Sequence, residues 1–267
     1  MNNLHRELAP VSDEAWAQIE QEAARTFKRN LAGRRVVDVA GPAGFAFSAA
    51  GIGRVRGIDP PADGVQARLR RVAPLVELRA PFTLSREEID DVARGALDAD
   101  WQPVKDAARQ IAFAEDGAIF EGYGAAGIEG IRQESSNQPV ILPADVKDDP
   151  AALAQALSQL RVAGVDGPYS EALSASANTE VSETSDHGYP IIDHIKRQLS
   201  GDIFWAPAIS GAIVLTTRGG DFSLHLGEDL AIGYLSHTDT EVSLYLQETL
   251  TFLMLTSEAA VGCTAPS

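Results

Sequence analysis

The sequence contains only one cysteine, Cys263, among its 267 residues. A single cysteine excludes an intrachain disulfide framework and a metal site built from several thiolates, and it favours a reducing compartment. The opening residues MNNLHRELAP lack the apolar core of a signal peptide. The apolar segment 250–255 is far too short to span a bilayer. We therefore expect a soluble, cytoplasmic protein that has no membrane partner.

Basic residues are also scarce, with 22 Lys and Arg against 38 Asp and Glu, which gives a formal net charge of -16. A field of that sign repels phosphate backbones. The first 35 residues carry six basic and five acidic side chains, so they do not form a polybasic arm. Nucleic acid is not predicted as a partner.

Motifs for catalysis and metal binding are missing as well. No serine lies in a G-x-S-x-G elbow, and the glycine-rich residues 51–57 lack the Lys-Ser/Thr ending of a phosphate loop. The neighbouring acids Asp90 with Asp91 and Glu115 with Asp116 fall on predicted helices, where adjacent side chains diverge, so we interpret them as solvated faces. None of the histidines has a Cys or carboxylate at a recognised metal spacing. They are His5, His187, His194, His225 and His237. We predict no enzymatic activity, no metal and no cofactor.

The residues that are present indicate an ordinary globular chain of one or two domains, 45% hydrophobic and 22% charged. Residues 12–32 read as a helix with Ser12 as N-cap and Gly33 as a left-handed stop. Its apolar stripe is Trp16, Ile19, Ala23 and Phe27. A strand is predicted over 35–39, followed by a stretch with little periodicity from 40 to 63 and a return to β pattern over 65–69.

Further helix starts carry recognisable caps. Ser85 and Glu88 form a predicted capping box, Asp100 is the expected cap of a second long helix, and Asp149 is the expected cap of a helix that ends at Gly164. Pro190 is predicted to open another helix after a strand at 171–175 and an exposed loop at 182–190. From residue 203 onward the pattern is mostly β, over 203–209, 213–217, 222–226, 230–236 and 242–255.

Two long segments and a dipeptide between them, all in the central region, resemble a known family. Residues 78–95 read LRAPFTLSREEIDDVARG, residues 100–101 read DW, and residues 112–131 read AFAEDGAIFEGYGAAGIEGI. This wording resembles the signature region of the bacterial encapsulins, the linocin-type shell proteins, and the similarity extends from about residue 3 to 259. The resemblance implies an α+β protein with the tailed-phage major-capsid fold of the Hong Kong 97 type.

That fold implies a discontinuous peripheral domain with two insertions. The peripheral domain would comprise the N-terminal helix and first strand in residues 1–48, the spine helices in 75–135 and the C-terminal strands in 228–267. Residues 49–74 would form an extended loop that serves as an intersubunit arm, and residues 136–227 would form the axial domain.

In function, the resemblance implies a shell protein that assembles with itself into an icosahedral particle, on the order of 60 copies for the smallest closure. Such a nanocompartment encloses cargo enzymes that carry a C-terminal targeting peptide. A dye-decolorising peroxidase or a ferritin-like protein is the implied cargo, with a role in oxidative stress or iron storage, and any haem or iron belongs to that cargo.

The resemblance also implies two groups of binding residues. The cargo peptide would dock beside the first helix, and a loop of the axial domain would surround a fivefold pore that admits small molecules. The cargo-peptide candidates are Phe27, Arg34, Asp38, Asp229, Leu230 and Ile232. The pore-loop candidates are Glu183, Asp186, His187 and Tyr189.

Two alternatives remain at this point. One is a phage capsid that packages nucleic acid, against which the acidic charge and the missing basic arm argue. The other is a secreted bacteriocin or protease, which the lack of a signal peptide and of a catalytic motif disfavours.

Overall fold

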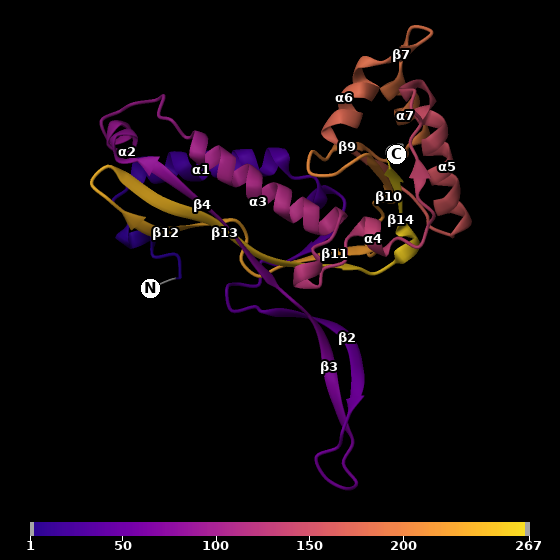
Figure 1. Cartoon of the computed structure of the whole chain (residues 1–267), viewed down its shortest axis with the longest axis horizontal. Coiled ribbons are helices and arrows are strands. Elements are labelled where there is room, and N and C mark those ends of the chain that lie inside the picture. Colours follow the sequence, from indigo (N-terminus) through magenta and orange to yellow (C-terminus); the bar gives the residue numbers. More distant parts are fainter. Residues whose placement is uncertain (1–2, 265–267) are drawn as a thin grey trace.

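A computed structural model describes residues 3–264 of the chain (Figure 1). An elongated body of helices over a sheet continues into a second lobe, and a two-stranded hairpin projects from their junction. The helices are α1 (Asp13–Asn30), α2 (Arg86–Ala93), α3 (Gln102–Phe120), α4 (Ile131–Glu134), α5 (Asp149–Val162), α6 (Ala175–Glu183) and α7 (Ile191–Gln198). The strands of the body are β1 (Asp38–Ala40), β4 (Val76–Ser85), β11 (Phe222–Leu226), β12 (Ala231–His237) and β13 (Glu241–Met254).

Helix α1 forms where the sequence predicts it. The Ser12 hydroxyl accepts a hydrogen bond from the Ala15 amide at 3.2 Å, acids occupy the first turn and bases the last. The expectation that Gly33 ends the helix in a left-handed conformation is wrong, because Gly33 begins a 3-10 turn over Gly33–Arg35. A glycine is needed there because an added Cβ would meet the Ile119 side chain at 2.5 Å.

The predicted capping box at the start of α2 is also wrong. The Ser85 side chain makes no capping hydrogen bond, and the Glu88 carboxylate instead accepts from the Asp100 amide at 2.9 Å. Glu88 therefore closes the connection between α2 and α3. Asp100 does serve the start of α3, since its carboxylate accepts from the Gln102 amide at 2.8 Å, although Trp101 is the residue that directly precedes the helix.

The body sheet is organised around β13, which pairs with β4, β11 and β12, while β1 adds to β11 in parallel. Helices α1 and α3 pack on one face of this sheet, where alternate residues of β4 and β13 are buried beneath them. The shared core contains Ile19, Phe27, Phe82, Leu84, Val104, Ile111, Leu244 and Leu246. The strand predicted over 35–39 is confirmed only at its end, as β1.

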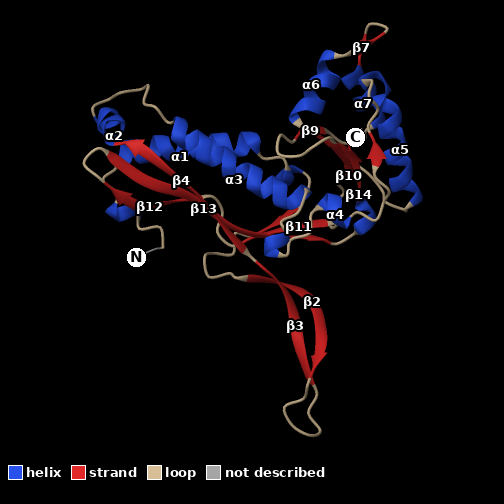
Figure 2. Cartoon of the chain, viewed as in Figure 1, coloured by secondary structure: helices blue, strands red, loops and turns tan. Residues whose placement is uncertain are grey.

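The second lobe has its own five-stranded sheet, in the order β5 (Val140–Ile141), β14 (Ala260–Thr264), β10 (Ala212–Thr216), β6 (Tyr169–Leu173) and β9 (Ile203–Trp205). Helices α5, α6 and α7 cover one face (Figure 2). Helix α5 ends as predicted at Gly164, which has φ +78°. The Gly164 amide donates to the Arg161 carbonyl and the Val165 amide donates to the Leu160 carbonyl. Asp149 is the first residue of α5 and not its cap.

Two elements of this lobe are absent from the sequence prediction. Helix α6 occupies residues that were expected to be strand end and loop, and it is capped by the Ser174 hydroxyl, which accepts from the Ala177 amide at 3.2 Å. Strand β14 follows the long strand β13 and pairs with β10. The β strands expected at 203–209, 213–217, 222–226, 230–236 and 242–255 are confirmed within a few residues, β9 being the shortest of them.

The projecting hairpin consists of β2 (Ala49–Ile58) and β3 (Ala67–Pro74). The two strands pair from Ala49 with Pro74 to Ile58 with Ala67, and the register shifts between Gly51 and Val55. Residues 40–63 were expected to lack regular structure. That expectation is wrong, because β2 lies within them. Most of its residues are exposed, and Figure 2 shows the hairpin extending away from both sheets.

A largely buried arginine joins the body to the second lobe. Arg132, in α4, donates to the Glu121 carboxylate at 2.9 Å, to the Ser210 carbonyl at 2.7 Å and to the Cys263 carbonyl at 3.2 Å. Its side chain is 16% exposed. One guanidinium therefore donates both to a carboxylate at the end of α3 and to backbone carbonyls of the second lobe.

Replacing Arg132 with Met is expected to lower the free energy of unfolding by about 2 to 4 kcal/mol, because several charge-assisted hydrogen bonds are lost and their acceptors stay partly buried. Guanidinium denaturation followed by tryptophan fluorescence measures this. The matched control is Arg94→Met, whose exposed ion pair with Asp91 is worth at most about 1 kcal/mol. Equal losses in the two variants would contradict a linking role for Arg132.

Candidate functional site

The clearest candidate site is a cavity of about 530 Å³ beside the C-terminal half of α1. Four of the six predicted cargo-peptide residues line it: Phe27, Arg34, Asp229 and Leu230. The remaining lining residues are Ala24, Lys28, Leu31 and Arg35. Most of this lining is apolar or cationic, and Asp229 is its one carboxylate.

A second cavity of about 330 Å³ adjoins the first, since Ala24 and Leu230 line both. Ile232 belongs to this second cavity, but its side chain is only 5% exposed and packs in the core under α1. The two cavities together form a groove along one flank of α1, and Leu230 stands at its middle. We call this the α1 groove.

Asp38 is not brought to the groove. Its carboxylate accepts a hydrogen bond from the Gly220 amide at 2.6 Å, at the end of β1 where that strand pairs with β11. Asp38 lines neither of the two cavities. The structure therefore gives it a role in holding the loop before β11.

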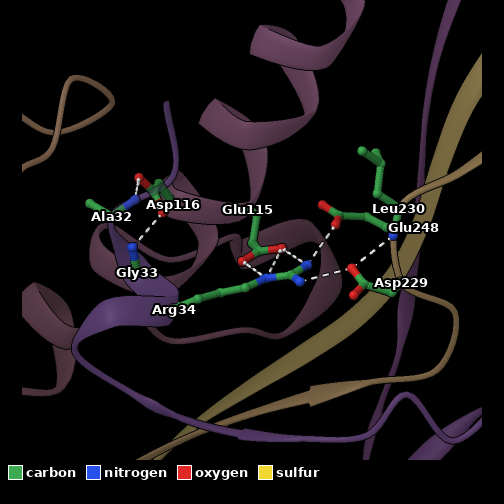
Figure 3. Close-up of polar contacts among 8 residues, drawn as sticks. All are labelled: Ala32, Gly33, Arg34, Glu115, Asp116, Asp229, Leu230 and Glu248. Atoms are coloured by element: carbon green, nitrogen blue, oxygen red, sulfur yellow. Dashed lines mark hydrogen bonds and ion pairs between the residues drawn. The ribbon is translucent and has the colours of Figure 1, made fainter. Parts of the chain in front are cut away.

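Arg34 closes one end of the groove through a buried ionic network (Figure 3). Its guanidinium donates to both carboxylate oxygens of Glu115, at 2.8 and 2.6 Å, to Glu248 at 3.3 Å and to Asp229 at 2.8 Å. The side chains of Glu115 and Glu248 are 0% exposed, whereas Asp229 is 46% exposed. Its donors are engaged within the chain, and its Cζ lies 5.1 Å from the centre of the Phe27 ring.

Asp116, the neighbour of Glu115 on α3, points to the other side of the helix. Its two oxygens accept from the amides of Ala32 at 2.8 Å and Gly33 at 2.7 Å, which fixes the turn that follows α1 (Figure 3). The interpretation of Glu115 and Asp116 as a solvated face is wrong, since both side chains are fully buried. Adjacent helix positions do diverge, as expected, but each finds its own buried partner.

Burial governs the protonation of this network. Burial raises the pKa of Asp116 to about 7 despite its two amide donors. Burial, and then the negative charge of Glu115, raise the pKa of Glu248 well above its ordinary value. Burial alone would lower the pKa of Arg34, but hydrogen bonds and charge from Glu115 and Asp229 raise it. The network therefore holds the Arg34 cation, and burial shifts the carboxyls of Asp116 and Glu248 towards their protonated forms.

Sequence reasoning missed Ala24, Lys28 and Leu31 of the groove. Together with Phe27 they follow the spacing of one helix face, so the helical period could have identified them. Glu115 and Glu248 carry no comparable signal, because nothing local in a sequence shows that a helix acid and a strand acid meet the same arginine.

The predicted pore loop forms the tip of the second lobe (Figure 1). Glu183 ends α6, and β7 (Ser185–Asp186) pairs with β8 (Tyr189–Pro190). His187 and Gly188 make the turn with φ of 46° and 87°. The Asp186 carboxylate lies 3.8 Å from the His187 ring, and His187 is 93% exposed. The hairpin therefore presents Asp186, His187 and Tyr189 outward as a compact polar tip.

Within residues 3–264, no three His, Cys, Asp or Glu side chains are grouped so that they could hold a metal ion. Among the helices of the same residues, none is both long and apolar enough to cross a bilayer.

Comparison with known proteins decides the family. A family described as "Encapsulating protein for peroxidase" (Linocin_M18) matches residues 1–251. The type 1 encapsulin shell protein of Mycobacterium tuberculosis is 63% identical over 262 residues, which cover 98% of this chain and 99% of that protein. The type 1 encapsulin shell protein of Rhodococcus erythropolis is 62% identical over 262 residues, with the same coverage. This chain belongs to the encapsulin family. Proteins of this description are structural shell proteins and not enzymes.

Solved structures that resemble this encapsulin share its fold at low sequence identity. The virus-like particle of Pyrococcus furiosus has a TM-score of 0.65 at 14% identity, covering 93% of this chain and 98% of that chain. The structure of Gordonia phage Cozz has a TM-score of 0.58 at 13% identity, covering 88% and 86%. The predicted Hong Kong 97-type capsid fold of the α+β class is therefore confirmed.

The buried network of this encapsulin leads to a pH-dependent prediction. A carboxyl whose pKa is raised by folding binds its proton more tightly in the folded state, so stability falls as pH rises from the unfolded towards the folded pKa. Asp116 contributes such a fall between about 3.8 and about 7. Glu248 adds a fall that begins above about 4.5.

Glu248→Gln is expected to remove the second fall, because glutamine keeps the shape and hydrogen-bonding groups of the protonated carboxyl without ionising. The stability difference from the unmodified protein should grow with pH by at most about 1.4 kcal/mol per pH unit. Denaturation curves between pH 5 and 8 would measure it, and parallel pH profiles would contradict it.

The matched control is Glu115→Gln, which makes the same substitution at an equally buried site. It breaks the bidentate pair with Arg34 and should cost about 3 to 5 kcal/mol already at pH 5. Because the charge of Glu115 also raises the pKa of Glu248, this variant flattens the pH profile only in part, so the loss of stability at pH 5 distinguishes the two variants.

Proposed function

We propose that this encapsulin assembles with identical copies into a closed icosahedral shell, on the order of 60 subunits, that encloses a cargo enzyme. The observation that carries the proposal is the projecting hairpin. Among the described residues, β2 and β3 pair only with each other, so their outer backbone edges remain available to another chain. Large apolar side chains are exposed on the hairpin, with Val55, Leu69 and Val72 between 48% and 54% exposed. A neighbouring subunit would cover both features.

The charge of the hairpin supports the same partner. Residues 49–74 contain five arginines and two aspartates, a net +3, so the remainder of the chain carries -19. A basic arm on an acidic body is complementary to the body of another copy. We therefore propose that residues 49–74 are the intersubunit arm, that the second lobe is the axial domain and that the body is the peripheral domain. The ranges expected from the sequence, 136–227 for the axial domain and 1–48, 75–135 and 228–267 for the peripheral domain, describe this division except at two strands, because β11 pairs in the body sheet and β14 in the lobe sheet.

The α1 groove is our proposed docking site for a short C-terminal targeting peptide of the cargo. Its apolar side chains suit a few buried anchors, and its length over two adjoining cavities suits an extended segment. The family description names a peroxidase as the encapsulated protein. A dye-decolorising peroxidase is accordingly our first expectation for the cargo and a ferritin-like protein our second, in a cytoplasmic compartment that serves oxidative stress defence or iron storage.

The polar tip formed by Asp186, His187 and Tyr189 is our proposed pore lining, with Glu183 at its base. The tip lies at the far end of the second lobe and its side chains are exposed, as a ring around a symmetry axis would require. In such a ring each charge is repeated once per subunit, which is how a weak single contact can filter small solutes.

Assembly is tested by reversing the charge of the arm. The triple variant Arg68→Glu, Arg70→Glu, Arg71→Glu changes the net charge of residues 49–74 from +3 to -3. The arm and the neighbouring body then repel each other, so closed particles should be lost while the subunit stays folded. Size-exclusion chromatography with negative-stain microscopy would measure particle formation, and circular dichroism would report folding.

The matched control makes the same charge change at exposed sites outside the arm, in the triple variant Arg94→Glu, Arg161→Glu, Arg197→Glu. It should assemble normally. Particles from the arm variant in the same yield as from this control would show that the arm charge does not direct assembly.

Cargo docking is tested at Leu230, the residue that both cavities share. Leu230→Asp removes an apolar contact and places a charge in the groove, which should weaken peptide binding by about 1 to 3 kcal/mol, or about fivefold to 150-fold. The expected result is intact shells that hold little cargo, measured by co-purification of a co-expressed peroxidase at equal shell recovery.

Leu235→Asp is the control, because it makes the same substitution on β12, the strand that directly follows Leu230, at a side chain that is 49% exposed and outside the groove. Its shells should load normally. Normal loading of Leu230→Asp shells would place the docking site elsewhere.

A further inference from the structure

A cleft of about 470 Å³ lies on the opposite flank of α1 from the groove, between α1, α3 and β9. Its lining combines four cations with polar and aromatic side chains and includes no acid. The residues are Arg25, Thr26, Arg29, Asn30, Lys105, Arg109, Phe113, Trp205 and Pro207. In a chain of net charge -16, this is a local reversal of sign. We call it the basic cleft.

The cations of the basic cleft are only partly neutralised. Among residues 3–264, Arg29 and Lys105 form no ion pair within 4.0 Å. Arg109 lies 3.7 Å from Asp106 with both side chains 49% exposed, which is a weak, solvent-screened pair. Arg25 is held by Glu22 at 2.8 Å. Three of the four cations are therefore available to a ligand.

The positive charges of the basic cleft lower the pKa of Glu22, an acid at its edge. Burial raises the pKa of Glu22. Hydrogen bonds from Arg25 and Thr26, together with the positive charges of Arg25 and Lys105, lower it by more than burial raises it, so its pKa lies below the ordinary value. A carboxylate at the edge of the cleft is thus stabilised in its ionised form. An anion inside the cleft would gain from the same charges.

The walls of the cleft are suited to a small molecule. Trp205, 37% exposed, and Pro207 line the cleft from the β9 side, Phe113 lies on α3 with Lys105 and Arg109, and the side chains of Thr26 and Asn30 are each 8% exposed. The volume is in the range that small-molecule ligands occupy, and the concave form is unlike the flat surface of about 800 Å² per partner that a stable subunit contact needs.

We propose that the basic cleft is a binding site for phosphate-bearing small molecules, held by Arg29, Lys105 and Arg109. A phosphate group carries up to two negative charges and accepts several hydrogen bonds, which matches converging guanidinium and ammonium donors. The aromatic wall is placed to contact an organic group attached to the phosphate. The site is independent of the α1 groove, because the two share no lining residue.

The test titrates purified full-length protein, in its native assembly state, with inorganic triphosphate and separately with ATP, both without divalent metal. Isothermal calorimetry measures affinity, and quenching of Trp205 fluorescence, assigned with a Trp205→Phe variant, reports the location. Saturable binding is expected that weakens as salt rises from about 0.05 to 0.3 M, because screening lengths fall below 10 Å over that range.

The double variant Arg29→Gln, Arg109→Gln should bind at least about tenfold more weakly, as removal of charge-assisted hydrogen bonds predicts. The control Arg161→Gln, Arg197→Gln removes the same charge at exposed sites outside the cleft and should bind as the unmodified protein does. Tighter binding of ATP than of triphosphate would assign a contribution to the aromatic wall, whereas equal binding would assign the site to the phosphate groups alone.

The proposal is overturned if neither probe binds saturably at low salt, or if the cleft variant and the control lose affinity equally. It is also overturned if the double variant and the milder Lys105→Gln both fail to assemble, since the cleft would then be a contact between copies. Neither result would bear on the charge-reversed arm or on cargo loading at Leu230.

Discussion

The fold of this encapsulin depends on burying several carboxylates around one guanidinium. Arg34 leaves the turn after α1, Glu115 comes from α3 and Glu248 from β13, so a single side chain joins the N-terminal helix, the spine helix and the longest strand. Lysine could not replace it, because its three donors on one atom cannot form the two parallel hydrogen bonds to Glu115 and also donate to Glu248 and Asp229. Burial and the charge of Glu115 raise the pKa of Glu248, which favours its neutral form beside Glu115, and the amides of Ala32 and Gly33 are satisfied separately by Asp116. Since Arg34 also ends the α1 groove, the same network that positions α1 determines the shape of the candidate docking site.

Local sequence signals predicted those parts of the fold that local interactions decide. Ser12 caps α1 because the capping residue and its amide lie three positions apart, and Gly164 ends α5 because only a residue tolerant of positive φ fits there. The errors arise where a distant partner competes. Glu88 has the spacing of a capping box but accepts from the chain beyond the end of its own helix, and Glu115 looks solvated until β13 brings Glu248 to it. Such contacts are set by tertiary packing, which the surrounding residues do not encode locally.

The residues of the candidate site likewise include some that the sequence could predict and some that it could not. Phe27 was predictable from the apolar stripe of α1, and Leu230 from the placement that the family resemblance implies, because both belong to regular elements or their immediate ends. Asp38 was expected beside Arg34 at the groove, but the 3-10 turn and the start of β1 carry it away towards Gly220, so it does not line the groove. Ile232 is on the expected strand, yet it faces the core. Strand membership could be predicted, whereas the exposed fraction of each side chain could not.

Helix α1 shows how one amphipathic segment can present two unlike surfaces. Successive residues are rotated by about 100° around a helix, so positions 24, 27, 28 and 31 face the groove while 25, 26, 29 and 30 face the basic cleft. The core stripe of Ala15, Ile19, Ala23 and Phe27 lies between them and holds the helix to the sheet. The proposed peptide and the proposed small anion therefore use different flanks of the same helix. Because the helix backbone is fixed by the core and by Arg34 and Asp116 at its C-terminal end, occupation of one flank need not deform the other, so the two proposed sites would be independent of each other.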